Sequence, residues 1–217
     1  MRAVVVAGST GEAGSLDERE RLVLLDQVRT AVGRAATVIA GTGAPSARQA
    51  AALTRAAVDH GADAVLALSP PGAADPLPYY RAVAGAAGDT PLLAYHFPAL
   101  SPPGIAVEQL AGLPVDAVKD SSGDPGRLLE ELAVETALPV YVGAATVLSM
   151  AGPLGCQGAI VALANAEPEL CRQAFEGDPE AQKRLLPSHL RAELRFPAGL
   201  KQLLAERWGT SPVVRLG

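Results

Sequence analysis

Short apolar runs recur along the chain, and most are followed by a segment that mixes apolar and charged residues at helical spacing. The runs of strand length are Ala3–Ala7, Thr37–Ala40, Ala64–Leu68, Leu92–Tyr95, Val115–Val118, Val140–Val142 and Ala159–Leu163. Their intervals of roughly 20 to 30 residues match one strand–helix unit. Since the runs are continuously apolar and do not alternate, they favour a parallel sheet covered by helices.

Helical patterns occupy intervals between the predicted strands, at Asp17–Val32, Ser46–His60, Asp124–Ala133 and Pro168–Leu186. Before the first of them, Ser15 is the candidate N-cap, and Glu18 is its capping-box partner three residues later. Ser46 and Gln49 repeat this spacing at the second helix. The sequence therefore predicts two defined helix starts.

The alternation runs through the chain without a linker, which predicts one domain over residues 1–217. A succession of strand–helix units favours a (β/α)8 TIM barrel, with an open doubly wound sheet as the alternative. The predicted strands are one fewer than the barrel needs, and the chain is shorter than the roughly 250 residues typical of that fold. Because a strand begins almost at Met1, we expect a barrel that lacks its first strand–helix unit.

The composition narrows the classes of partner. Hydrophobic residues make up 49% and charged residues 19% of the chain, which is typical of a globular protein. Dispersed charges with a net value of −5, and only 4% aromatic residues, argue against a nucleic-acid partner. The chain has no apolar run of roughly 18 residues and no signal-peptide pattern, so we expect a cytoplasmic protein without a membrane partner. Cys156 and Cys171 lack metal spacing and are predicted to be small buried residues.

Functional groups of parallel α/β folds gather at the C-terminal ends of the strands. Lys119 stands at such an end and is one of three lysines, against fifteen arginines. One interpretation is a salt bridge with Asp116, Asp120 or Asp124. The other is a Schiff-base nucleophile, since removing an amine from water favours its neutral form, which attacks a ketone and yields a cationic imine.

Tyr95 and a glycine-rich turn would complete such a site. Tyr95, at the end of another strand, is either a core tyrosine or a proton carrier for the carbon next to the imine. His96 would then face the helices, because consecutive strand residues point to opposite faces. The turn "GSTGEAG", which begins at Gly8, offers backbone amides and the Ser9 and Thr10 hydroxyls to a carboxylate or phosphate, but its spacing fits no nucleotide motif. A 2-oxo acid such as pyruvate carries both a ketone and a carboxylate.

Six motifs, in order, resemble the dihydrodipicolinate synthase/N-acetylneuraminate lyase family: "GSTGEAGSLDERER", "VIAGTG", "GADAVLALSPP", "YHFPALS", "VKDSSGD" and "GCQGAIVALANAEPE". The resemblance extends from Ala3 to about Gly209. It implies a (β/α)8 barrel and a class I aldolase or lyase that acts on pyruvate and an aldehyde without a metal or other cofactor. It also implies a homo-oligomer, either a dimer or a tetramer.

The resemblance implies roles for individual residues as well. Lys119 matches the Schiff-base lysine of the family, and Tyr95 matches its proton-relaying tyrosine. Ser9 and Thr10, which follow Gly8, match the hydroxyl pair of the G-[ST]-x-G-E loop that holds the pyruvate carboxylate.

Two further positions match residues that line the family's pocket, and two segments differ from the family's pattern. Gly158 and Ile160, in "GAIVALAN", stand where the family lines the pyruvate pocket. "PALSPPG" lacks the arginine with which dihydrodipicolinate-forming members bind a second carboxylate, and Leu100 stands near its place. "SPPGAAD" lacks the family's tyrosine pair, so Tyr79 and Tyr80 are expected to be packing residues of the following helix. Relative to the family, we expect the chain to be shortened at both ends.

These observations favour one function and leave alternatives. The favoured function is a metal-free class I Schiff-base aldolase that cleaves a 4-hydroxy-2-oxo acid, because "VKDSSGD", "ALAN" and "RFPAGLKQLLAERWG" look more like 4-hydroxy-2-oxoglutarate and sugar-acid aldolases. One alternative is a 4-hydroxy-tetrahydrodipicolinate synthase. Another is a truncated, non-catalytic homologue that binds 2-oxo acids, and a third is a nucleotide-dependent enzyme that uses the glycine-rich turn.

Overall fold

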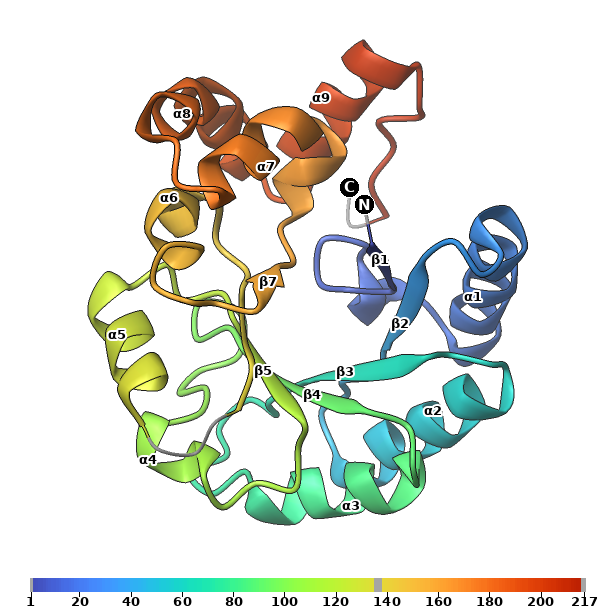
Figure 1. The fold of residues 1–217 in the computed structure, drawn as a ribbon. Helices are drawn as coiled ribbons and strands as arrows, with labels where there is room; N and C mark the ends of the chain where they lie inside the picture. Colours follow the sequence, from blue (N-terminus) through green and yellow to red (C-terminus); the bar gives the residue numbers. More distant parts are fainter. Residues whose placement is uncertain (1, 135–137, 216–217) are drawn as a thin grey trace. The chain divides into compact units, whose positions relative to one another are not determined.

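A computed structural model describes residues 2–134 and 138–215 of the chain. The chain groups into two compact units, Met1–Lys119 and Asp120–Gly217, and each unit is described by itself. Within each unit, neighbouring strands of the sheet follow chain order. Strands and helices alternate up to residue 159, and only helices follow among the described residues beyond it (Figure 1).

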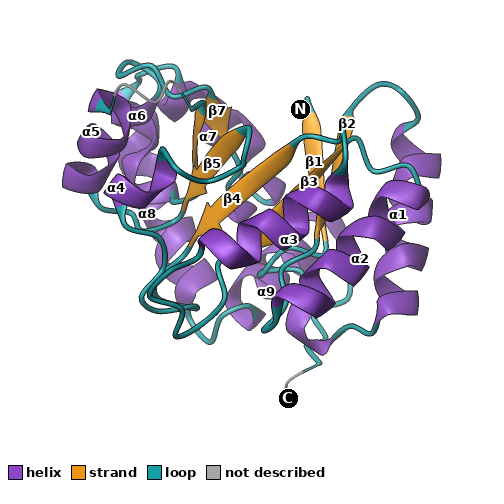
Figure 2. Cartoon of the chain, turned by 90° about the horizontal axis from the view of Figure 1, so that it is seen from below, coloured by secondary structure: helices purple, strands orange, loops and turns teal. Residues whose placement is uncertain are grey.

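The first unit is a parallel sheet covered by helices. Its strands β1 to β4 pair in chain order, all parallel, and helices α1 to α3 lie along one face of them (Figure 1). Helices α2 and α3 pack side by side (Figure 2). The elements are β1 (Ala3–Val6), α1 (Glu18–Val32), β2 (Thr37–Gly41), α2 (Ala47–Asp59), β3 (Ala64–Leu68), α3 (Leu77–Ala87), β4 (Leu92–His96), α4 (Val107–Leu110) and the start of β5 (Ala117–Asp120).

The core of this unit fills the space between the strands and the first two helices. Val6 and Val38 of the strands meet Leu25 of α1 and Ala57 of α2. Leu25 belongs to an apolar stripe of α1 with helical spacing, which includes Val28 and which buries one face of the helix. Burying a side chain of this size contributes about 2 kcal/mol. The apolar residues whose spacing predicted the helix are therefore the ones that pack it against the sheet.

The start of α1 lies two residues later than the sequence predicts. Asp17 is the N-cap: its carboxylate accepts from the Glu20 backbone N–H at 2.8 Å, and the Glu20 carboxylate accepts from the Asp17 N–H at 3.0 Å. The prediction of Ser15 with Glu18 was wrong, because the Ser15 hydroxyl instead donates to the Glu12 carbonyl within a short 3-10 turn. The N-cap of α2 at Ser46 is confirmed.

Two strand starts are held by aspartates in a repeated D-A-V sequence, at residues 63–65 and 116–118. The Asp63 carboxylate accepts from the Val38 N–H at 2.7 Å, and the Asp63 N–H donates to the Val38 carbonyl at 2.9 Å. Asp116 makes the same pair of bonds with Leu92, both at 2.8 Å. Each carboxylate thus satisfies an N–H group at the start of the preceding strand, which would otherwise lack a partner.

The described part of the second unit contains the end of β5, followed by α5 (Pro125–Ala133), β6 (Val140–Val142), α6 (Leu148–Ala151), β7 (Gly158–Ala159), α7 (Pro168–Phe175), α8 (Pro179–Glu193) and α9 (Ala198–Trp208), with short 3-10 turns between some of them. Strands β6 and β7 are parallel. Cys156 and Cys171 are buried and unpaired, as predicted. None of the helices in the described ranges is both long and apolar enough to cross a membrane.

Two sequence predictions in this unit were wrong in part. The strand predicted over Ala159–Leu163 is limited to two residues, because Ala162–Asn165 forms a 3-10 turn in which the Asn165 side chain donates to the Ala162 carbonyl. The helix predicted over Pro168–Leu186 is divided into α7 and α8. Gly177 adopts a positive φ of 101°, and Asp178 caps the new helix.

Candidate active site

Lys119 and Tyr95 meet at the C-terminal ends of β5 and β4. The Lys119 Nζ lies 3.9 Å from the centroid of the Tyr95 ring. The two residues are 8% and 5% exposed, respectively, so the ammonium group is largely withdrawn from water. A cation over the face of an aromatic ring is attracted by the ring quadrupole. The structure therefore brings together the two reactive groups that the sequence singled out.

The aspartates offered by the sequence as ionic partners of Lys119 have other roles. Asp116 accepts from the Leu92 backbone N–H, and Asp124 caps α5 by accepting from the Gly126 N–H at 2.8 Å. Asp120 accepts from the Ser122 N–H at 2.8 Å and from the Ser122 hydroxyl at 2.9 Å. All three carboxylates thus have partners in the local backbone or its turns, and Asp120 also lies 3.8 Å from the Arg127 guanidinium.

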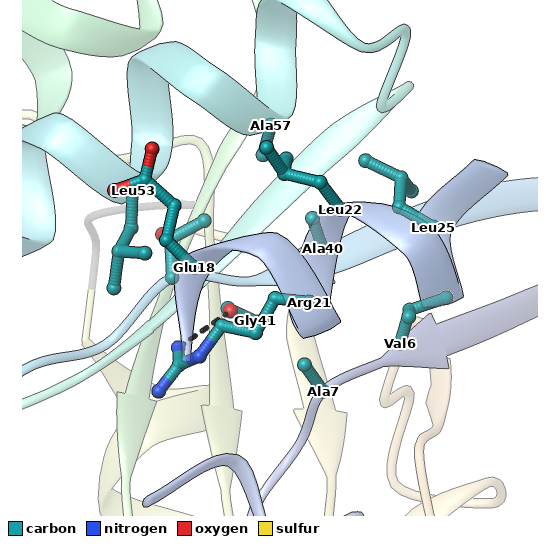
Figure 3. Close-up of a pocket in the computed structure, with 11 residues that line it drawn as sticks. Val6, Ala7, Glu18, Arg21, Leu22, Leu25, Ala40, Gly41, Leu53 and Ala57 are labelled. Atoms are coloured by element: carbon teal, nitrogen blue, oxygen red, sulfur yellow. Dashed lines mark hydrogen bonds between the residues drawn. The ribbon is translucent and has the colours of Figure 1, made fainter. Parts of the chain in front are cut away.

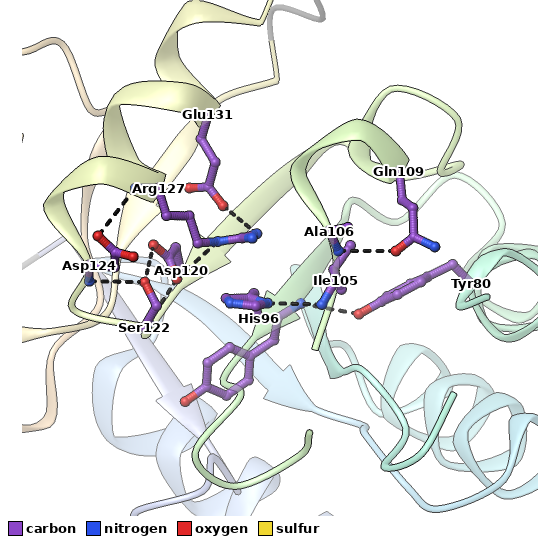
Figure 4. A network of polar contacts seen from close by, with 11 residues as sticks. Tyr80, His96, Ile105, Ala106, Gln109, Asp120, Ser122, Asp124, Arg127 and Glu131 are labelled. Atoms are coloured by element: carbon purple, nitrogen blue, oxygen red, sulfur yellow. Dashed lines mark hydrogen bonds and ion pairs between the residues drawn. The ribbon is translucent and has the colours of Figure 1, made fainter. Parts of the chain in front are cut away.

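His96, the neighbour of Tyr95, has a packing role. Its Nδ1 accepts from the Ile105 backbone N–H at 2.9 Å, and its ring lies so close to Gly104 that a Cβ there would approach it to 2.5 Å (Figure 4). Because Nδ1 is the acceptor, a proton on the neutral ring is carried by Nε2. The structural role predicted for His96 agrees with these contacts.

The glycine-rich turn follows β1, at the same edge of the parallel sheet as the end of β4. Its backbone is folded back on itself: the Glu12 N–H donates to the Ser9 carbonyl at 3.0 Å, and the Ala13 N–H donates to the Gly8 carbonyl at 3.3 Å. Glu12 has a positive φ of 56°, which is uncommon for a residue other than glycine. Gly8, Ser9 and Thr10 are half-buried.

Three polar side chains that the sequence did not single out as functional reach these strand ends from helices. Arg21 of α1 donates to the Ala13 and Gly41 carbonyls. Tyr79 and Tyr80 are buried in α3, which confirms the packing role predicted for them, but both hydroxyls also bond to the backbone. Arg21 precedes Leu25 by four residues, so an arginine on the apolar stripe of a helix was the available signal.

A small cavity adjoins the Arg21 side chain between α1 and the sheet (Figure 3). Its volume is about 20 Å³, and its lining includes Val6, Leu22, Leu25, Ala40 and Arg21. This volume is enough for about one water molecule and too small for an organic substrate. The cavity therefore belongs to the packing beneath the glycine-rich turn.

Gly158 and Ile160 lie in the second unit. Gly158 begins β7, and the Ile160 N–H donates to the Val142 carbonyl at 2.8 Å, which continues the pairing of β7 with β6. Both residues are half-buried. A Cβ at Gly158 would lie 3.1 Å from the Tyr141 ring, so this position favours glycine. Their role in lining a pyruvate pocket stays a prediction.

The second unit also buries a charged cluster that the sequence did not reveal. Arg127 of α5 lies between two carboxylates, 2.7 Å from Glu131 and 3.8 Å from Asp120 (Figure 4). The Glu131 side chain is fully buried, and neither of its oxygens has a well-aligned hydrogen-bond donor among the described residues. Burial, reinforced by the nearby Asp120, raises the pKa of Glu131 to about 7, although Arg127 opposes this shift. Elsewhere in the described ranges, no three His, Cys, Asp or Glu side chains gather as metal ligands would.

Comparison with known proteins identifies the family of the chain. A sequence model of the dihydrodipicolinate synthetase family matches residues 1–203. The chain belongs to this family. Family members are lyases and aldolases, and they include class I Schiff-base enzymes.

Individual members of the family resemble the chain over most of its length. An uncharacterized DapA-like lyase of Halobacterium salinarum is 32% identical over 211 residues, which cover 93% of this chain and 69% of that protein. A 4-hydroxy-tetrahydrodipicolinate synthase of Pseudomonas aeruginosa is 34% identical over 204 residues, which cover 86% of this chain and 70% of that protein. The first relative is described only as a lyase, whereas the name of the second gives its reaction.

Among solved structures, the dihydrodipicolinate synthase of Acinetobacter baumannii, determined in complex with pyruvate, superimposes with a TM-score of 0.85. It is 28% identical, and the match covers 100% of this chain and 83% of that one. The fold class is therefore the (β/α)8 TIM barrel with one strand–helix unit fewer, as the sequence predicted.

Proposed function

We propose that the protein is a metal-free class I aldolase that forms a Schiff base between Lys119 and the 2-oxo group of pyruvate or a pyruvate-yielding acid. The observation that carries the proposal is the position of the Lys119 amine, buried at a strand end and 3.9 Å from the ring centre of Tyr95. An amine withdrawn from water is a better nucleophile, and a phenol beside it is a proton carrier within reach of the bound substrate.

The reaction begins when Lys119, after its ammonium proton has passed to water, adds as the neutral amine to C2 of a 4-hydroxy-2-oxo acid. A proton of the amine then moves to the C2 oxygen, which gives a carbinolamine. Tyr95 gives its proton to the departing hydroxyl, so that water leaves, an iminium forms and the phenol becomes a phenolate. The phenolate takes the proton of the 4-hydroxyl, the C3–C4 bond breaks, and its electron pair moves into the iminium to give an enamine and a free aldehyde. The iminium acts as the electron sink that makes this cleavage possible.

Release of pyruvate uses the same two residues in reverse order. Tyr95 protonates C3 of the enamine, which restores an iminium and a phenolate. Water then adds to C2 while the phenolate takes one of its protons, and collapse of the carbinolamine returns the Lys119 amine with pyruvate. Tyr95 has donated and accepted two protons each, so the enzyme is regenerated.

The remaining predicted residues bind the substrate. The Ser9 and Thr10 hydroxyls and the backbone amides that follow Gly8 are suited to hold the carboxylate, because the turn offers several donors to one anion. Gly158 and Ile160 would line the pocket around the pyruvate methyl group. The partners are thus a small 2-oxo acid and an aldehyde, in a cytoplasmic homo-oligomer whose size light scattering would measure.

Cleavage of a 4-hydroxy-2-oxo acid is favoured over dihydrodipicolinate synthesis by the segment that follows β4. It contains no arginine to pair with a second carboxylate, and Leu100 is 49% exposed there. The alternative of a 4-hydroxy-tetrahydrodipicolinate synthase is supported by the name of the Pseudomonas aeruginosa relative. Turnover of pyruvate with aspartate semialdehyde, compared with pyruvate release from 4-hydroxy-2-oxoglutarate, distinguishes the two reactions.

Borohydride reduction in the presence of pyruvate tests the proposal directly. We expect a stable mass increase on the peptide that contains Lys119, and its loss in Lys119→Arg. Lys183 and Lys201, the other two lysines, serve as internal controls on other peptides. A folded protein that gives no adduct at Lys119 would exclude the Schiff-base reaction. An adduct without turnover of either substrate would identify instead a non-catalytic homologue that binds 2-oxo acids.

A further inference from the structure

Tyr80 connects helix α3 with the strand that carries Tyr95. Its side chain is fully buried, and its hydroxyl donates to the Ala67 carbonyl at 2.9 Å. The same oxygen accepts from the Tyr95 backbone N–H at 3.3 Å (Figure 4). Ala67 precedes Leu68, which is the register partner of Tyr95 in the β3–β4 pair. One hydroxyl therefore joins both strands at the level of the candidate proton carrier.

Arg21 makes an equivalent connection between helix α1 and the glycine-rich turn. Its guanidinium donates to the Ala13 carbonyl at 2.5 Å. It also donates to the Gly41 carbonyl at 3.3 Å (Figure 3). Gly41 ends β2 and touches the backbone that leads into the turn, since a Cβ there would lie 2.1 Å from the Ala7 carbonyl oxygen. Arg21 thus fixes the far end of the turn to the neighbouring strand.

Tyr80 is fully buried and Arg21 is partly buried. Burial lowers the pKa of Arg21 and raises that of Tyr80, which shows that each is held in surroundings unfavourable to charge. A buried hydroxyl or guanidinium is tolerated only because it is hydrogen-bonded. Its bonds are directional, whereas apolar packing is not, so these side chains fix the orientation of the backbone that they contact.

We propose that Arg21 and Tyr80 are positioning residues of the aldolase site: Arg21 holds the turn that binds the substrate carboxylate, and Tyr80 holds the strand end that presents Tyr95. The inference rests on the proposed function. Neither residue touches substrate in this scheme. Each acts on a different half of the reaction, Arg21 on binding and Tyr80 on proton transfer.

The two halves are separable by experiment. In Tyr80→Phe the ring remains and one oxygen is lost, so the Tyr95 backbone loses a bond while the carboxylate turn is unaffected. We expect exchange of the pyruvate methyl protons in D2O, which requires proton transfer at C3 of the enamine, to slow by on the order of 10-fold. The pyruvate concentration for half-maximal borohydride trapping should stay within about twofold of the wild-type value.

Arg21→Met should affect pyruvate binding and leave proton transfer unchanged, which is the opposite of the result expected for Tyr80→Phe. The turn loses its connection to β2, so the half-maximal pyruvate concentration should rise by on the order of 10-fold, since a hydrogen bond from a charged donor is stronger than one between neutral groups. Methyl-proton exchange at saturating pyruvate should change little. Arg21→Lys keeps the charge and one donor group, so it should recover part of the affinity.

Matched controls remove an equivalent group from the same helices. Tyr79→Phe deletes the neighbouring buried hydroxyl, which accepts from the Ala44 N–H at 3.2 Å, beyond the end of β2. Arg29→Met removes an arginine from the last turn of α1, which pairs with Asp63 beside the start of β3. Both controls should lower the urea midpoint without moving either pyruvate measurement.

A second measurement tests the Tyr80 contact independently of chemistry. In Tyr80→Phe, the Tyr95 amide proton should exchange with solvent faster than in wild type or in Tyr79→Phe, as followed by NMR on protein shown to be folded by circular dichroism. If wild-type protein is trapped by borohydride with pyruvate, but Tyr80→Phe and Arg21→Met behave like their control variants, the positioning roles are wrong and the proposed function stands. Absence of any wild-type adduct would remove both.

Discussion

Replacing Glu131 by glutamine should remove a contribution that makes the protein less stable as pH rises from 4.5 to 7. The carboxyl has an ordinary pKa of 4.5 when unfolded, and burial beside Asp120 raises its pKa to about 7 in the folded chain. Between these values the folded state keeps a proton that the unfolded state has lost. Because the folded state then binds more protons, the free energy of unfolding falls as pH rises through this window.

The size of the effect follows from the pKa difference. Each pH unit between the two pKa values changes the free energy of unfolding by about 1.4 kcal/mol, so Glu131 should cost about 3 kcal/mol between pH 4.5 and pH 7. The Arg127 guanidinium, 2.7 Å from Glu131, works in the opposite direction. It is shared with Asp120 at 3.8 Å, so it neutralises only one of the two carboxylates.

Urea unfolding at a series of pH values measures this difference. The difference in unfolding free energy between wild type and Glu131→Gln should decline by about 3 kcal/mol from pH 4.5 to pH 7.5. Glu130→Gln is the matched control, since Glu130 is the exposed neighbour on the same helix. Parallel curves for wild type and Glu131→Gln would refute the reasoning, and a difference that grows with pH would show that the ion pair with Arg127 dominates over burial.

Two further predictions concern the first unit. Asp17→Ala removes the N-cap of α1 and should lower the free energy of unfolding by about 1 kcal/mol, whereas an unchanged urea midpoint would mean that the capping box contributes nothing. Gly41→Ala places a Cβ 2.1 Å from the Ala7 carbonyl and should destabilise by about 1–3 kcal/mol, while Gly14→Ala, where a Cβ meets nothing within 4 Å, should cost less than 1 kcal/mol; equal costs would contradict the steric argument.

Strands β3 and β4 were predictable because their side chains are buried on both faces. Ala64–Leu68 was predicted with both of its boundaries, and four of its five residues are buried. The same rule failed for Ala159–Leu163, where an apolar composition continues into a 3-10 turn. Apolar residues occur in strands and in tight turns alike, so composition does not distinguish the two. The end of β7 depends on hydrogen bonds, which composition does not reveal.

The candidate site shows a similar division. Lys119 and Tyr95 could be found from the sequence because a reactive residue at the end of an apolar run is conspicuous. Arg127 and Glu131 could not, because a pair of opposite charges four residues apart on a helix is typical of an exposed face. Only the packing of α5 shows that Glu131 is buried, and only the position of Asp120 at the end of β5 supplies the second negative charge.

Asp116, the aspartate of the second D-A-V sequence, affects the face of the sheet from which the Lys119 side chain projects. Side chains alternate between the faces of a strand, so a slip of β5 by one residue would exchange the face of Lys119 with that of Val118 or Asp120. The two bonds between Asp116 and Leu92 lie three residues before Lys119 and allow one alignment of β5 with β4. The carboxylate that the sequence offered as the ionic partner of Lys119 thus selects the side of the sheet on which its amine emerges.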